Sequence, residues 1–155
     1  MKPIFVQSIP HTGTFFCFDH LFANWRRAEK YPMLREGEKW RMHFGEPVEL
    51  PQGDFLTVVP LRNPIAVAQS WIHRGLDLSK LAAMFLHAEA LRNVFFLPID
   101  SPRKHEYLAA LTRAVGHELE TDWRKINSEP AYDPRISDDA LSISREFSDL
   151  TARFW

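Results

Sequence analysis

Cysteine is almost absent from this chain of 155 residues, since Cys17 is the only one. A single cysteine excludes an internal disulfide, a thiolate zinc cluster and a CxxC redox pair. An excess of one charge is missing as well, because 19 Lys and Arg face 20 Asp and Glu and leave a net charge of −1. Such a balance provides no general field for nucleic acid or an anionic membrane. We therefore expect no nucleic-acid partner.

Long hydrophobic runs are also missing. The longest, residues 55–61 and 94–99, are far shorter than the roughly 20 residues that cross a bilayer. The sequence opens on Met1-Lys2-Pro3, without the apolar stretch and cleavage site of a secretory signal. We expect a cytoplasmic protein that does not enter the membrane.

In other respects the composition is that of an ordinary globular domain, with 45% hydrophobic and 25% charged residues. A chain of this length hides roughly 70% of its unfolded surface on folding, which allows a sizeable core without disulfides or structural metals. The 11 prolines are scattered and form no linker, and no internal repeat is present. These features predict a single domain over residues 1–155.

Short β-type runs alternate with stretches of helical periodicity along the chain. The β-type runs are residues 4–6, 39–44, 55–61 and 94–99, and helical stretches follow Gly13, Asn63, Ser79, Ser101 and Ser137. The last helix is expected to carry Leu141, Phe147, Leu150 and Phe154. Strands that alternate with helices predict an α/β protein, with a parallel sheet and helices on both of its faces.

The first β-type run is followed by the loop Pro10-His11-Thr12-Gly13-Thr14, which opens a helix. Backbone N–H groups at a helix start favour phosphate, and the side chains of His11, Thr12 and Thr14 could add donors. An ordinary turn is the alternative, because a strand, a glycine turn and a helix occur in nearly every α/β protein. The loop is not a Walker A motif, since it has no lysine and no second glycine.

The third β-type run ends at Arg62, and Asn63 and Pro64 then begin a helix. Ser70 lies seven positions after Asn63. At about 100° per residue it returns to the same side of that helix. Arg62 and Ser70 could therefore contact one anion, and the alternative is an exposed arginine with a surface serine. No acidic metal partner of the kind found in P-loop nucleoside-triphosphate enzymes follows this run.

Both segments resemble motifs of the sulfotransferases that use 3′-phosphoadenosine 5′-phosphosulfate (PAPS). Residues 10–16 read PHTGTFF and resemble the family loop PKSGTTW, which wraps the 5′-phosphosulfate. Residues 62–70 read RNPIAVAQS and are similar to the segment RNPxDVAxS, whose Arg and Ser bind the 3′-phosphate. Residues 42–52 resemble the stretch that carries the family's catalytic histidine, and residues 97–116 are similar to its downstream strand and helix.

The resemblance implies a P-loop-type three-layer fold, with a parallel sheet of four or five strands flanked by helices. It implies PAPS as the cofactor, no metal, and contacts to the cofactor from His11, Thr12, Gly13, Thr14, Phe15, Phe16, Arg62 and Ser70. His11 stands where the family has lysine, so its implied role is to assist the leaving group. Phe16 falls at the tryptophan that stacks on adenine, although a core phenylalanine is the alternative.

His43 is the candidate general base, because an acceptor hydroxyl must lose its proton during sulfuryl transfer. A surface histidine at a strand end is the alternative, and His20 is the rival candidate. The implied activity transfers a sulfuryl group to a hydroxyl or amine of a small molecule or carbohydrate. The family's acceptor-binding insertions are largely missing from this shorter chain, so a second copy in a homo-oligomer could complete the site.

Two other functions stay open. The first is a non-catalytic protein that binds PAPS or its product 3′-phosphoadenosine 5′-phosphate (PAP), which the missing lysine would allow. The second is a P-loop kinase of small molecules, against which the absent Walker lysine and the absent metal-binding acid argue.

Overall fold

The computed structural model describes residues 4–13, 16–17, 41–43, 56–116, 118–119, 138, 142, 145 and 147–155. In chain order its elements are β1 (Ile4–Ser8), β2 (Arg41–His43), β3 (Leu56–Leu61), α3 (Pro64–His73), α4 (Leu78–Ala90), β4 (Phe95–Pro98), α5 (Lys104–Val115) and α7 (Ser148–Phe154). No described helix is long and apolar enough to cross a membrane.

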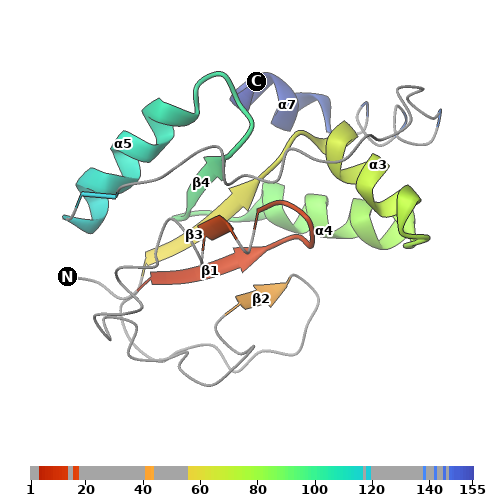
Figure 1. The fold of residues 1–155 in the computed structure, drawn as a ribbon, viewed down its shortest axis with the longest axis horizontal. Helices are drawn as coiled ribbons and strands as arrows, with labels where there is room; N and C mark the ends of the chain where they lie inside the picture. The colour runs from red at the N-terminus through yellow and green to blue at the C-terminus, as the bar shows by residue number, and fades with distance from the viewer. Residues whose placement is uncertain are drawn as a thin grey trace.

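The four strands form one parallel sheet in the order β2-β1-β3-β4 (Figure 1). Ser8 of β1 is in register with His43 of β2, and Leu61 of β3 is in register with Pro98 of β4. Because every neighbouring pair is parallel, the carboxyl ends of all four strands lie at one edge, which we call the carboxyl edge. The expected α/β class with a parallel sheet is confirmed, whereas the P-loop type and a fifth strand stay predictions.

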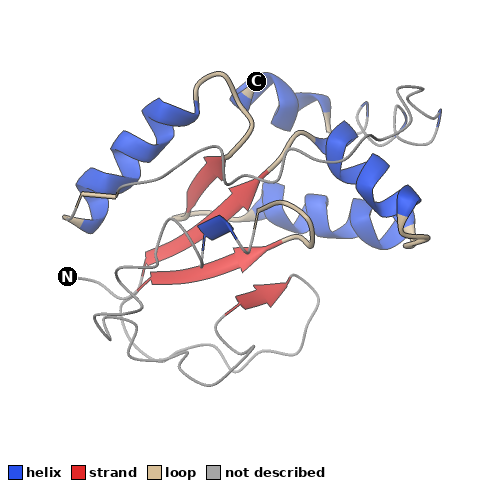
Figure 2. Ribbon diagram, in the orientation of Figure 1, coloured by secondary structure: helices blue, strands red, loops and turns tan. Residues whose placement is uncertain are grey.

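Helices pack on both faces of this sheet, and Figure 2 shows them in blue around the strands. The side chains of adjacent strand residues alternate between two core clusters, so that Val58 belongs to one and Val59 to the other. The cluster beneath α3, α4 and α7 contains Ile9, Val59, Leu61, Val67, Ala68, Trp71, Leu81, Phe85, Ala88, Phe96, Phe147 and Phe154. The cluster beneath α5 contains Ile4, Val6, Phe16, Cys17, Val58, Leu97, Ile99, Leu111, Val115 and Leu119. Because helices cover both faces of the sheet, β3 is apolar along nearly its whole length.

The start of α3 follows directly from local sequence. The Asn63 side chain accepts a hydrogen bond from the Ile65 N–H at 3.0 Å, and Pro64 occupies the first helical turn. The chain leaves the helix through Gly75, whose φ is +65°. These signals place Ser70, as predicted, on a helix that begins at the carboxyl edge, and Trp71 lies on the same helix.

The last helix differs in part from its prediction. One helix is expected from residue 137 to residue 154; the described residues 138, 142 and 145 are helical, but the helix is interrupted at Phe147 and α7 begins at Ser148. Phe147 has φ −114° and ψ 33°, is 1% exposed, and packs its ring 5.1 Å from that of Phe85. Burial of this ring in the core accompanies a break in the helical backbone, which periodicity alone does not predict.

Candidate functional site

The loop after β1 is a tight turn held by Thr12. The Thr12 N–H donates to the Ile9 carbonyl oxygen at 3.2 Å, and the Thr12 hydroxyl donates to the same oxygen at 2.7 Å. His11 has φ +72°, a backbone conformation that is uncommon outside glycine. Thr12 is fully buried, so its hydroxyl closes the turn where the sequence predicted a contact to the cofactor.

Gly13 allows this loop to approach the end of β4. Its φ is +103°, and a Cβ at this position would overlap the Cδ1 of Ile99. Ile99 in turn donates its N–H to the Leu61 carbonyl oxygen at 2.9 Å, which extends the pairing of β3 and β4. A helical turn begins behind the glycine, since the Cys17 N–H donates to the Gly13 carbonyl oxygen at 3.0 Å. The loop is therefore fixed against the carboxyl edge by contacts that only glycine permits.

Trp71 connects the two predicted ligand-binding segments. Its indole Nε1 donates to the Pro10 carbonyl oxygen at 3.1 Å, so α3 is bonded to the loop after β1. The preceding residue, Ser70, is 2% exposed, and the Arg62 side chain is 12% exposed. The alternative interpretation, an exposed arginine with a surface serine, is therefore wrong.

Asp100 follows β4 and lies beside Arg62. Both of its carboxylate oxygens accept from the Asn63 N–H at 3.1 Å, and Oδ1 also accepts from the Trp155 indole Nε1 at 3.1 Å. The Nε of Arg62 is 3.8 Å from Oδ2. Burial raises the pKa of the Asp100 carboxyl above its usual range, although the Asn63 amide, the Arg62 charge and the Trp155 indole oppose that rise.

One donor of the Arg62 guanidinium has no acceptor among the described residues. This donor is Nε, which is buried and has no hydrogen-bond partner in that part of the chain. A buried donor left without a partner costs about 1–3 kcal/mol. Asp100 supplies a nearby opposite charge, but at 3.8 Å it does not satisfy the Nε–H. The arrangement thus leaves a cation at the carboxyl edge that an anion's oxygen would satisfy.

The structure places the other predicted site residues in separate parts of the fold. His43 ends β2, and its backbone pairs with Ser8 at the carboxyl edge. His11 is half-buried in the loop after β1. Phe16 is 4% exposed within the core beneath α5, which is the placement that its alternative interpretation describes. Thr14 and Phe15 lie outside the described residues.

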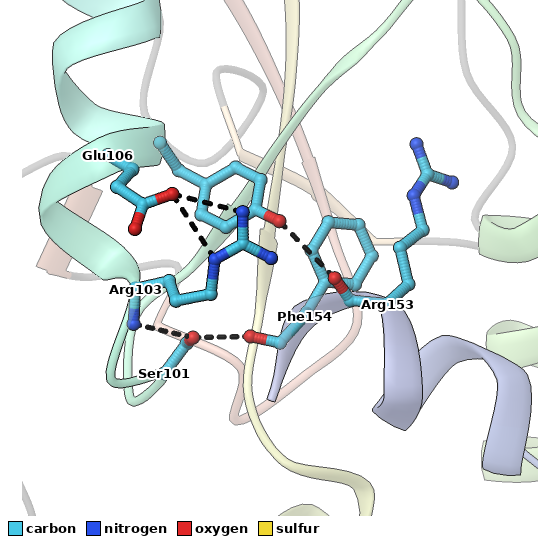
Figure 3. A network of polar contacts seen from close by, with 6 residues as sticks. Ser101, Arg103, Glu106, Arg153 and Phe154 are labelled. Carbon is cyan, nitrogen blue, oxygen red and sulfur yellow. Dashed lines mark hydrogen bonds and ion pairs between the residues drawn. The ribbon is translucent and has the colours of Figure 1, made fainter.

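The C-terminal segment is held near the carboxyl edge by hydrogen bonds to the turn between β4 and α5 and to α5 itself (Figure 3). The Ser101 hydroxyl donates to the Phe154 carbonyl oxygen and accepts from the Arg103 N–H at 3.0 Å. The Tyr107 hydroxyl donates to the Arg153 carbonyl oxygen at 3.3 Å. The bonds to the Phe154 and Arg153 carbonyl oxygens hold the chain beside Trp155, and they join residues too far apart in sequence for a local pattern to reveal. Sequence reasoning accordingly missed the roles of Asp100 and Trp155.

Comparison with protein-family models, with curated proteins and with solved structures found no match to this chain. The candidate site therefore rests on the geometry of its residues and on their sequence motifs. The carboxyl edge joins a glycine turn that begins a helix, an arginine whose buried Nε has no hydrogen-bond partner in the described part of the chain, and the backbone of a histidine at the end of β2. These features are suited to binding an anionic ligand.

Proposed function

We propose that this protein is a PAPS-dependent sulfotransferase of the P-loop type, which transfers a sulfuryl group to a hydroxyl or amine of a small molecule or carbohydrate. The observation that carries the proposal is the buried Arg62 Nε, which has no hydrogen-bond partner among the residues that the structure describes. Arg62 directly follows β3, and the neighbouring strand β1 ends in the glycine turn at the same edge. This juxtaposition supports the sequence resemblance, in which these two segments bind one cofactor.

The residues at the edge fit most of that cofactor. Arg62 offers a fixed positive charge and planar donors, which suit a phosphate, and we assign the 3′-phosphate to Arg62 with Ser70. The helical turn behind Gly13 suits the 5′-phosphosulfate. Thr12 does not fit as a side-chain ligand, because its hydroxyl and its N–H are both bonded to Ile9. PAPS, when bound, supplies the sulfuryl group and the phosphate that leaves.

Two histidines complete the proposed chemistry. His43 would take the proton of the acceptor hydroxyl, since its strand ends beside that of Ser8 at the carboxyl edge. His11 would donate to the leaving phosphate from the loop after β1. Imidazole is charged only part of the time near neutral pH, so this assistance would fade as the pH rises.

A non-catalytic PAP-binding protein is the second candidate. The bonds of Thr12 to Ile9 favour it, because they remove donors from the loop that would stabilise the leaving group. Transfer from radiolabelled PAPS to a panel of hydroxyl and amine acceptors separates the two functions. Binding of PAP without transfer to any acceptor would support the binding protein.

The cofactor assignment is tested by calorimetry with PAP and with adenosine 5′-phosphosulfate, which lacks the 3′-phosphate. The native protein should prefer PAP, and Arg62→Ala should lower PAP affinity about 10–100-fold, as expected for charge-assisted bonds. Arg74→Ala is the matched control, because Arg74 is exposed at the far end of α3. Equal affinities of the native protein for the two ligands would overturn the assignment of Arg62 and Ser70.

A further inference from the structure

The Asp100 carboxylate is held beside Arg62 by donors from two other parts of the fold. The Asn63 N–H at the start of α3 donates to both of its oxygens, and the Trp155 indole after α7 donates to Oδ1, all at 3.1 Å. The separation of 3.8 Å between Oδ2 and Arg62 Nε is longer than a hydrogen bond. The carboxylate therefore provides a counter-charge for Arg62 while its own hydrogen bonds go elsewhere.

This separation matters for ligand binding. A carboxylate at hydrogen-bond distance from a guanidinium occupies its donors and competes with any other anion for them. We propose that Trp155 is a positioning residue, whose indole N–H holds the Asp100 carboxylate away from Arg62 and so leaves the Arg62 Nε–H without a competing acceptor when an anionic ligand binds. That ligand is taken to be PAP, so this part of the inference rests on the proposed function.

The indole itself is fixed by contacts outside the anion site. The Phe154 ring packs 5.4 Å from Phe96 and 5.4 Å from Tyr107, and the Trp155 ring meets it edge-on at 6.1 Å. The carbonyl oxygens of Arg153 and Phe154 accept from Tyr107 and Ser101. Trp155 is thus placed by the packing of α7 on β4 and α5, independently of the carboxylate to which it donates.

The first test measures PAP affinity in a double-mutant cycle. Trp155→Phe keeps an aromatic ring but removes the N–H, and we expect it to weaken PAP binding about five-fold, a change of the size that one hydrogen bond produces. In the Asp100→Asn background the same substitution should change the affinity less than about two-fold, because no carboxylate remains to move toward Arg62. An equal loss in both backgrounds would show that Trp155 acts only on overall stability and would overturn the proposal.

Tyr107→Phe is the matched control. It removes the bond to the Arg153 carbonyl oxygen on the same segment but leaves the bond between Trp155 and Asp100. This variant should be slightly less stable and should bind PAP with native affinity. A loss equal to that of Trp155→Phe would assign the effect to loosening of α7 and would contradict the positioning role.

A second measurement needs no ligand. In crystal structures without added nucleotide, the Asp100 carboxylate of Trp155→Phe should move to within about 3 Å of Arg62 Nε, whereas that of the native protein should stay beyond hydrogen-bond distance. A carboxylate that does not move in the variant overturns the proposal even if PAP binds as proposed. If the carboxylate moves but the native protein binds no PAP, the proposed function fails and the control of Arg62 by Trp155 is supported.

Discussion

The Trp71 indole Nε1 lies 3.1 Å from the Pro10 carbonyl oxygen, a hydrogen bond that spans 61 positions of sequence. Trp71 is 4% exposed and belongs to the core beneath α3, so its ring cannot turn away without repacking that core. The bond fixes the loop that contains His11 to the helix that contains Ser70. The geometry of the proposed cofactor site therefore depends on a residue that need not touch the cofactor.

Trp71→Phe should separate this bond from the general hydrophobic role of the side chain. We expect the free energy of unfolding to fall by about 1–3 kcal/mol, because the Pro10 carbonyl loses its donor, and PAP affinity to fall with it. Urea denaturation and calorimetry measure the two effects. Tyr107→Phe also removes one hydrogen bond but lies on α5, so it should lower stability without changing PAP affinity. Native PAP affinity in Trp71→Phe would contradict the role given to the bond.

Gly13→Ala should destabilise the protein more than Gly116→Ala. Both glycines have positive φ, +103° and +67°, but only at Gly13 would the added methyl overlap a neighbour, Ile99. Backbone strain costs roughly 1–2 kcal/mol at each position, and overpacking adds about 1 kcal/mol or more at Gly13. Thermal or urea unfolding of the two variants measures the difference. Equal losses would show that Ile99 yields freely to the loop.

The parts of the fold that depend on neighbouring residues could be predicted from sequence. Asn63 and Pro64 begin α3 as expected, because caps and turn residues act within a few positions. The run at residues 55–61 predicted a strand of a parallel sheet with helices on both faces, and Val58 and Val59 of that strand pack in opposite clusters.

The parts of the fold that depend on contacts between distant segments could not be predicted from sequence. Sequence marks Thr12 as a donor but does not show that Ile9 accepts both of its bonds. From sequence alone Arg62 was open to two interpretations, exposure to solvent or contact with an anion, because its burial depends on how Asp100 and Trp155 pack around it. Those contacts require α7 to return to the carboxyl edge, and no local pattern encodes that return.

Because of Asp100, the free energy of unfolding should fall as the pH rises through the acidic range. Burial raises its pKa in the folded protein, so the folded state binds the proton more tightly than the unfolded chain, whose carboxyl titrates near pH 4 (about 3.9). Asp100's contribution is fully present below the unfolded pKa and is lost as the pH rises through the folded pKa. Asp100→Asn should remove this slope, as measured by denaturant unfolding between about pH 3.5 and pH 6. Parallel pH profiles for the native protein and the variant would contradict the assignment.

His11→Lys tests the proposed assistance to the leaving group. A lysine stays protonated above neutral pH, whereas an imidazole with an ordinary pKa near 6.5 does not. If His11 donates to the leaving phosphate, the variant should retain transfer activity and decline less steeply as the pH rises from about 7 to about 9. Rates of transfer from PAPS across this range provide the measurement. A variant that binds PAP but transfers nothing would show that His11 has another role.

His43→Ala tests the proposed general base. The backbone of His43 pairs with Ser8 at the end of β2, so the residue emerges at the carboxyl edge beside the loop that contains His11. Removal of a positioned base usually slows the chemical step by about 10²–10⁴-fold. Because the base acts on the acceptor, PAP affinity should stay near its native value. Single-turnover transfer and PAP titration, performed side by side, separate these two effects.

His20→Ala is the comparison, since His20 is the rival candidate, and it should leave both transfer and binding unchanged. Near-native turnover in His43→Ala would exclude His43 as the base, and a collapse confined to His20→Ala would give the role to His20.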